Sequence, residues 1–68
     1  MKHYYIHFEV GEGYPDYEFV IKAKDFESAK FLAGVTLSAD YPEQFKSDND
    51  FYCIEITAEQ LLERLTIN

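Results

Sequence analysis

The feature that most constrains this chain is a regular alternation of apolar and polar residues in two neighbouring stretches, 2–10 and 17–24. A period of two residues is typical of β-strands that bury one face. Residues 11–16 between them contain two glycines and a proline, which favour a turn. The pattern therefore predicts a β-hairpin. The residues expected on its buried face are Tyr4, Ile6, Phe8, Val10, Tyr17, Phe19, Ile21 and Ala23.

A helix is predicted to follow the hairpin, over about residues 26–38. Asp25 is its candidate N-cap, because the carboxylate can accept a hydrogen bond from a free N–H of the first turn. Glu27 lies in that turn, where the helix dipole favours negative charge. Gly34 weakens the helix and is a candidate for an early end. The face expected to pack on the sheet carries Phe26, Ala29, Ala33 and Leu37, with Leu32 beside them.

The rest of the chain predicts a loop, a third strand and a short helix. Residues 39–50 are mostly polar and contain Pro42, so we expect a loop with one short helical turn. Residues 51–57 are β-branched and aromatic, which favours a strand. Thr57 and Gln60 match a capping box for a helix over residues 58–66. The residues expected to face the core are Tyr52, Ile54 and Ile56 of the strand, with Leu61, Leu62 and Leu65 as the stripe of the helix.

These elements predict a single α+β domain with the order β-β-α-β-α. We expect a three-stranded antiparallel sheet with strand order 2-1-3, the first strand in the centre and the main helix on one face. The short last helix is expected beside the first helix, on an edge of the sheet or over the open face. A length of 68 residues allows one domain and no more.

Cysteine content and hydropathy indicate the compartment. The single cysteine, Cys53, excludes an internal disulfide, which fits a reducing cytoplasm. No signal-like apolar run follows the first residues, and no stretch approaches the roughly 18 apolar residues that span a bilayer. We therefore expect a soluble cytoplasmic protein.

The charge balance limits the partners. Six basic residues stand against thirteen acidic ones, for a net charge of −7 at pH 7. Such a charge repels DNA, RNA and anionic membranes and attracts proteins with basic surfaces. We expect a protein partner of that kind, with no direct nucleic-acid or membrane binding. The alternative is that the acidity only maintains solubility.

The residues of catalytic and metal chemistry do not form a recognisable pattern. His3 and His7 lie on one strand face, but at about 3.3 Å per residue their Cα atoms are roughly 13 Å apart. Because zinc ligands lie at about 2 Å from the ion, this pair cannot share one. Cys53 with a histidine and Glu9 offers the residue types of a nucleophilic triad, but a small sheet predicts no deep pocket. We expect no enzyme, no metal and no cofactor.

Acidic residues on the hairpin and in the long loop are the candidate binding surface. Together they could imitate a phosphate backbone, with Tyr5 and Tyr14 as aromatic anchors. The alternative is a solvated rim without a partner. The open sheet face is a second candidate interface, with Tyr5, Val20 and either Phe51 or Cys53 exposed. The residues predicted to bind a protein are Tyr5, Glu9, Glu12, Tyr14, Asp16, Glu18, Asp48 and Asp50.

The segment from Val20 to Ala33 is similar to a pattern found in small phage and plasmid proteins. A strand ends in A-K-D, and E-S-A-K-F-L-A then opens a helix. In this segment, 14 of the 68 residues, the chain resembles anti-CRISPR proteins of similar length, acidity and β-β-α-β order. The resemblance implies a phage-encoded inhibitor that blocks the basic nucleic-acid channel of a CRISPR effector in the host cytoplasm. The alternative is a self-associating structural or regulatory module without enzymatic activity, possible as a homodimer.

Overall fold

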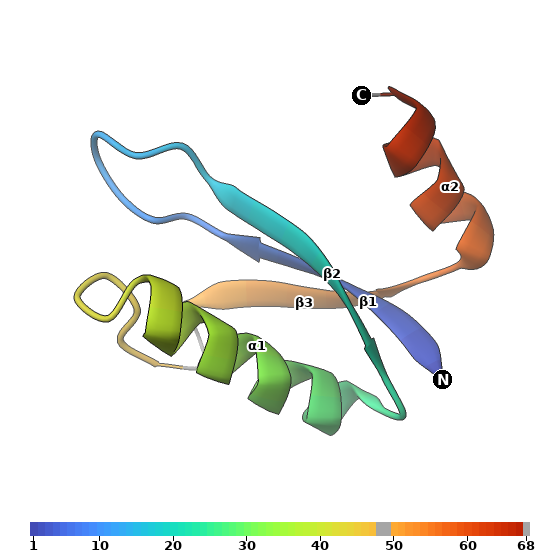
Figure 1. Cartoon of the computed structure of the whole chain (residues 1–68), viewed down its shortest axis with the longest axis horizontal. Coiled ribbons are helices and arrows are strands. Elements are labelled where there is room, and N and C mark those ends of the chain that lie inside the picture. Colours follow the sequence, from blue (N-terminus) through green and yellow to red (C-terminus); the bar gives the residue numbers. More distant parts are fainter. Residues whose placement is uncertain (48–49, 68) are drawn as a thin grey trace.

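The computed structural model describes residues 1–47 and 50–67, with side chains as far as Glu63 in the last helix. Its three-stranded antiparallel sheet has the order β2-β1-β3, which confirms the predicted fold class and the central first strand. Figure 1 shows α1 along one side of the sheet and α2 beyond the end of β3, apart from α1. The last helix therefore does not lie beside the first. The elements are β1 (Lys2–Phe8), β2 (Tyr17–Ala23), α1 (Phe26–Asp40), β3 (Phe51–Ile56) and α2 (Ala58–Ile67).

The hairpin forms as its alternation predicts. Strands β1 and β2 pair along their whole length, from Lys2 opposite Ala23 to Phe8 opposite Tyr17. The backbone N–H of Tyr14 donates to the carbonyl of Gly11 at 3.1 Å and closes a turn. Gly11 has a φ of +138°, which a residue with a side chain rarely adopts. Glycine thus permits the turn. Along β1, the side chains that face α1 are almost fully buried.

Helix α1 is two residues longer than expected. It continues through Gly34 to Asp40, because packing against the sheet outweighs the low helix propensity of glycine. Ala29, Ala33 and Leu37 are completely buried, as predicted. Leu32 was expected beside them but is 44% exposed, because it lies about 100° round the helix from Ala33.

Phe26 is the other exception on α1. It was expected in the core, yet its side chain is 47% exposed. It stands in the first turn of the helix, at the margin of the sheet, and its ring meets the edge of Tyr4 at a centroid distance of 6.3 Å. Phe26 therefore covers one end of the core without being enclosed by it.

Strand β3 presents the opposite face from the one expected. Phe51 is buried on the α1 side, whereas Tyr52 and Ile54 point away from it and are 63% and 54% exposed. Phe51 and Cys53 make the α1 side of β3 apolar as well, up to Glu55 near the end of the strand, so alternation selects only weakly between the two faces. Pairing of Phe51 with Phe8 of β1 makes the selection. Ile56 is buried as predicted, although alternation along β3 places it on the same face as exposed Tyr52.

The loop after α1 folds onto the hairpin end of the core. The N–H of Phe45 donates to the carbonyl of Tyr41 at 2.9 Å, which confirms the predicted short helical turn. The rings of Tyr41 and Phe45 lie 5.8 and 6.0 Å from that of Phe8, within the range of favourable aromatic contacts. This packing fixes the loop at the end of the sheet where the hairpin turns. Over the described residues, neither helix has the length and apolar character needed to cross a bilayer.

Both predicted helix caps are confirmed. Asp25 accepts a hydrogen bond from the N–H of Ser28 at 2.8 Å. At α2, the N–H of Gln60 donates to the Thr57 hydroxyl at 3.1 Å, and the N–H of Thr57 donates to the Gln60 side chain at 2.8 Å. Each cap satisfies backbone donors that the first helical turn leaves free.

The Asp25 cap predicts a stability that depends on pH. The hydrogen bonds from Ser28 hold the pKa of the Asp25 carboxyl below its usual value of 3.8. A carboxyl with a lowered folded-state pKa stabilises the fold above its unfolded pKa, and this contribution is lost as the pH falls through the folded value. Asp25→Ala is therefore expected to lower the melting temperature at pH 7 and to make less difference at pH 2. Thermal unfolding of both proteins across this range is the measurement; an equal difference at every pH would contradict it.

Candidate functional site

The sheet face opposite α1, called the open face below, carries a graded surface. Its side chains come from alternate residues of all three strands, and their nature changes from one end of β1 to the other. Near the start of β1 the face is basic and apolar, in the middle it is apolar, and near the hairpin turn it becomes acidic. The cross-strand rows in that order are Lys22–His3–Ile56, Val20–Tyr5–Ile54 and Glu18–His7–Tyr52.

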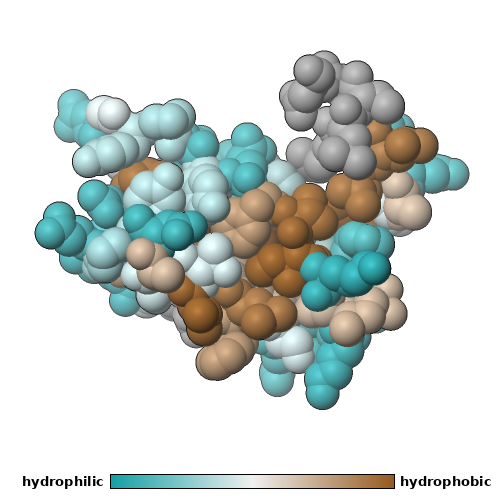
Figure 2. All heavy atoms as spheres, in the orientation of Figure 1, coloured by the Kyte–Doolittle hydropathy of each residue, from teal (hydrophilic) through white to brown (hydrophobic). Residues whose placement is uncertain are grey.

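Carboxylates gather at the hairpin end of the molecule, called the acidic end below. The hairpin turn and the loop after α1 lie at this end, on the left in Figure 1, and Figure 2 shows the hydrophilic surface they form there. Tyr17 of β2 donates a hydrogen bond to Asp40 at 3.2 Å, which ties the end of α1 to the hairpin. Among the described residues, Lys46 is the one cation of this end. Its carboxylates are Glu9, Glu12, Asp16, Glu18, Asp40, Glu43 and Asp50.

The cations of the sheet lie at its other end. Lys2 pairs with Ala23 in the register of β1 and β2, and Lys22 and Lys24 flank the same position. Lys2 also approaches Glu55 at 3.8 Å, between side chains that are both about half exposed. Such an exposed pair contributes little stability. The lysines at this end lie beside Glu55 and Asp25, so charges of both signs are mixed there, whereas carboxylates predominate at the acidic end.

The predicted binding residues lie on the hairpin, on the open face and in the loop after α1. Glu9, Asp16 and Glu18 are among the carboxylates of the acidic end described above. Glu12 and Tyr14 are exposed at the hairpin turn, with Tyr14 at 55%. Tyr5 is half-buried in the middle of the open face, so it offers less contact area than expected. Asp50 is exposed but accepts hydrogen bonds from the N–H groups of Lys46 and Ser47 at 2.7 and 3.0 Å, which order the loop. Asp48 lies outside the described residues.

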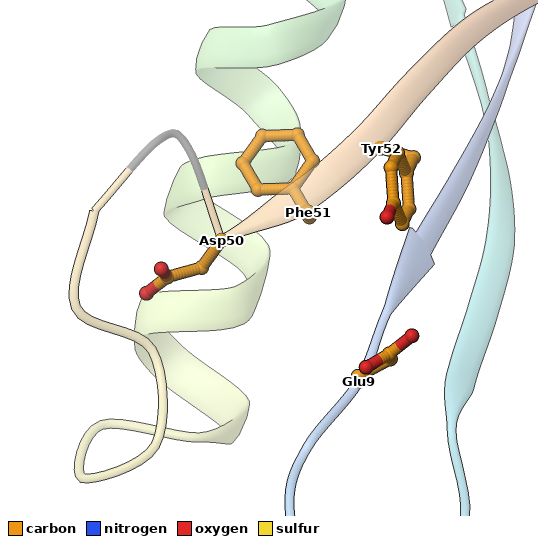
Figure 3. A pocket seen from close by; sticks show the side chains of 4 residues that line it. All are labelled: Glu9, Asp50, Phe51 and Tyr52. Atoms are coloured by element: carbon orange, nitrogen blue, oxygen red, sulfur yellow. The ribbon is translucent and has the colours of Figure 1, made fainter.

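Glu9 and Asp50 share a shallow hollow at the acidic end. Figure 3 shows the side chains that line it, and it also includes Phe51 and Tyr52. Its volume of about 140 Å³ is well below the roughly 300–1,000 Å³ of pockets that enclose small molecules. Carboxylates beside an aromatic ring attract a cation through charge and through the ring face. The hollow therefore suits one lysine or arginine side chain better than a substrate.

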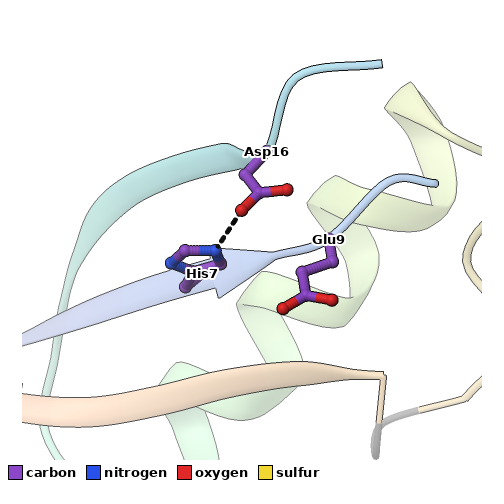
Figure 4. A group of neighbouring side chains, drawn as sticks. All are labelled: His7, Glu9 and Asp16. Carbon is purple, nitrogen blue, oxygen red and sulfur yellow. Dashed lines mark hydrogen bonds and ion pairs between the residues drawn. The ribbon is translucent and has the colours of Figure 1, made fainter. Parts of the chain in front are cut away.

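His7 is the centre of a polar network that the sequence did not predict. Its Nε2 atom lies 2.9 Å from a carboxylate oxygen of Asp16, and its Nδ1 atom lies 3.0 Å from the hydroxyl of Tyr5. The Tyr5 hydroxyl donates to Glu18, and the ring of Tyr52 meets the imidazole edge to face at 6.2 Å. Figure 4 shows the contact between His7 and Asp16, with Glu9 beside them. Tyr5 shares β1 with His7, but Asp16, Glu18 and Tyr52 come from other parts of the chain, so no local motif could have revealed the whole network.

Cys53 does not have the setting of a nucleophile. It is half-buried on the α1 side of β3, and burial raises the pKa of its thiol. A thiol that stays protonated at neutral pH is a poor nucleophile. The expectation that Phe51 or Cys53 is exposed on the open face is wrong, because register places both on the helix side. That the chain is not an enzyme stays a prediction.

Apolar side chains are exposed at two places away from the acidic end. On the open face, Val20, Tyr52 and Ile54 are 37–63% exposed. On the outer side of α1, Phe31 is 69% and Val35 is 53% exposed. Figure 2 shows hydrophobic surface running from α2 across the strands to α1. Exposed apolar area of this kind is typical of an interface.

Comparison with known proteins adds no relative. No family model, no curated protein and no solved structure matches the chain. The case for a function therefore depends on the placement of its residues.

Proposed function

We propose that this chain is a small protein-binding inhibitor whose acidic end occupies a basic, nucleic-acid-binding surface of its target. The observation that carries the proposal is the gathering of carboxylates from the hairpin, from the end of α1 and from the following loop at one end of the fold. Charges from separate segments form one surface, which can meet several lysines and arginines together. Phosphates along a nucleic-acid strand present the same kind of target to those cations.

The hollow between Glu9 and Asp50 supplies an anchor within this surface. A basic side chain entering it would meet the carboxylate of Glu9 and the ring of Tyr52, with Asp50 at the margin. Binding energy at protein interfaces concentrates in a few such anchors, and arginine is among the most frequent. Tyr14, exposed at the hairpin turn, offers an aromatic contact beside it. Attraction between the charges would then speed the association, and the basic side chain in the hollow would fix how the partner is positioned on the acidic end.

The proposed target class is the effector complex of a CRISPR system or another nucleic-acid-handling machine of a bacterial host. The resemblance of the segment from Val20 to Ala33 to anti-CRISPR proteins supports this class, with a phage or mobile element as the source. An effector holds its guide and target strands in a positively charged channel. An acidic end that competes for this channel would block binding without any catalytic step.

Capture at two salt concentrations tests the proposal. Tagged protein is incubated with nuclease-treated bacterial lysate at low and at high salt, and the bound proteins are identified by mass spectrometry. We expect a nucleic-acid-binding complex at low salt and much less of it at high salt, because salt screens exposed charges. The captured complex, once purified, should lose nucleic-acid binding in a gel-shift assay when the protein is added. Unchanged nucleic-acid binding at saturating inhibitor would reject the proposal.

A second candidate function is self-association through the open face. The exposed side chains of Val20 on β2 and of Tyr52 and Ile54 on β3 favour it, because they form an apolar surface on the two strands that flank β1. This candidate requires a dimer that tolerates salt and that weakens with Ile54→Ser or Tyr5→Ala. Light scattering at micromolar protein concentration gives the oligomeric state. A monomer at this concentration would reject self-association as the function.

A further inference from the structure

We propose that His7, Glu9 and Asp16 form a binding site for a divalent transition-metal ion. One imidazole nitrogen and one oxygen from each carboxylate all lie within 4.8 Å of one another. Figure 4 shows the three side chains as neighbours at the acidic end, with Asp16 directed at His7. The site does not depend on the proposed function, because it needs no protein partner.

The backbone brings these ligands together through strand geometry. His7 lies in β1, and Glu9 follows directly after the end of this strand. Asp16 immediately precedes β2, in which Glu18 pairs with His7 and Tyr17 pairs with Phe8. Extending this register by one step beyond the pair of Phe8 and Tyr17 places Asp16 opposite Glu9. The hairpin end of the two paired strands therefore brings the three ligands together, although Glu9 and Asp16 are seven residues apart in the sequence.

His7 already meets one carboxylate of the cluster. Its Nε2 atom lies 2.9 Å from a carboxylate oxygen of Asp16, and its Nδ1 atom lies 3.0 Å from the Tyr5 hydroxyl, which donates to Glu18. The imidazole is thus oriented with Nε2 toward Asp16. A metal ion bound at Nε2 would replace the direct contact between His7 and Asp16.

The distances suit a metal ion. An ion about 2.1 Å from both Nε2 and the Asp16 oxygen, which are 2.9 Å apart, would see them at an angle of roughly 90°. That angle is typical of neighbouring ligands in octahedral coordination. Ligands of such an ion lie at most about 4.2 Å apart, so the 4.8 Å limit of the cluster requires only a small rotation of exposed Glu9.

The ligand set selects the kind of ion. Magnesium and calcium prefer oxygen ligands alone, whereas an imidazole with carboxylates suits zinc and its neighbours. Metal-bound histidines almost always donate their other ring N–H to an acceptor that fixes the ring. The contact from Nδ1 to Tyr5, continued to Glu18, supplies this acceptor. Zn²⁺ is therefore the expected ligand, with solvent in the remaining positions.

Titration of untagged protein with ZnCl₂ by isothermal calorimetry tests the site. We expect saturable binding of one ion, and no comparable heat with MgCl₂. His7→Gln and Asp16→Asn should each weaken binding at least about tenfold. The matched controls are His3→Gln, on the same strand face, and Glu12→Gln, in the same turn; both should bind Zn²⁺ as the parent does. Cys53→Ser should also leave binding unchanged, which excludes the thiol as the ligand.

An NMR measurement on the parent protein tests the site without relying on variants, which could fail to fold. The ring nitrogens of His7 should shift on addition of ZnCl₂, with Nε2 moving most, while those of His3 stay in place. Absence of saturable binding, or equal losses in the His3→Gln and His7→Gln proteins, would overturn the proposal. His7 ring nitrogens whose signals are unmoved by Zn²⁺ would also overturn it.

Discussion

Replacing Leu37 with alanine is expected to remove much of the stability of this protein. Leu37 is completely buried in the cluster that contains Ile6, Phe8 and Phe51. Truncating such a leucine costs roughly 2–5 kcal/mol, because the transfer free energy is lost and a cavity remains. Domains are stable by only about 0.05–0.15 kcal/mol per residue, so a chain of 68 residues has little reserve. We expect a partly or largely unfolded protein at room temperature.

Leu32→Ala is the matched control, since it makes the same change in the same helix. Leu32 is 44% exposed, so its truncation should cost about 1 kcal/mol or less. Urea unfolding followed by circular dichroism gives the free energy of unfolding of both variants. The comparison requires that the free energy falls with urea concentration at the same slope in each variant. Equal losses from the two substitutions would show that α1 does not pack through the face of Ala29, Ala33 and Leu37.

The Glu12→Lys, Asp16→Lys double variant is expected to bind the captured partner at least about tenfold more weakly than the parent. Both residues are exposed at the hairpin turn, and the change shifts the charge of the acidic end by four units. Attraction to lysines and arginines of the partner becomes repulsion, which slows association and removes close pairs. A measurement of binding kinetics on a surface carrying the purified partner gives the affinity and both rate constants.

The control for this prediction is the Glu27→Lys, Glu59→Lys double variant. It has the same net charge, but its substitutions lie at the starts of α1 and α2, away from the acidic end. Buffers should contain a metal chelator, so that loss of the His7, Glu9 and Asp16 site cannot contribute. Similar losses in both double variants would mean that net charge, not the acidic end, attracts the partner. Unchanged binding in the first variant would remove this surface as the binding site.

The two proposals lead to a common question about the acidic end. Glu9 and Asp16 are surface carboxylates for a basic partner and also ligands of the proposed metal site. A bound divalent ion would neutralise part of the charge that attracts lysine and arginine side chains. Comparing partner affinity with ZnCl₂ and with chelator therefore measures whether the two ligands compete.

The sequence by itself determined the elements and the starts of the two helices, because these depend on near neighbours. Alternation over 2–10 and 17–24 identified the hairpin, and the glycines of residues 11–16 identified its turn. The caps at Asp25 and Thr57 follow from hydrogen bonds within one helical turn. Strand order followed as well, since a central first strand lets both neighbours pair with it antiparallel.

Tertiary structure alone decided which surfaces these elements present. The sequence pattern placed Tyr52 and Ile54 in the core. Phe51 and Cys53 make the other face of β3 apolar as well, and the register of β3 against β1 turned Tyr52 and Ile54 outward. The same strand pairing brought Asp16 to His7 and the loop after α1 to the hairpin. Such contacts join residues far apart in the chain, and their free energy depends on the packing of whole faces. Local pattern therefore predicts the strands and helices, while the candidate sites arise only when the sheet has formed.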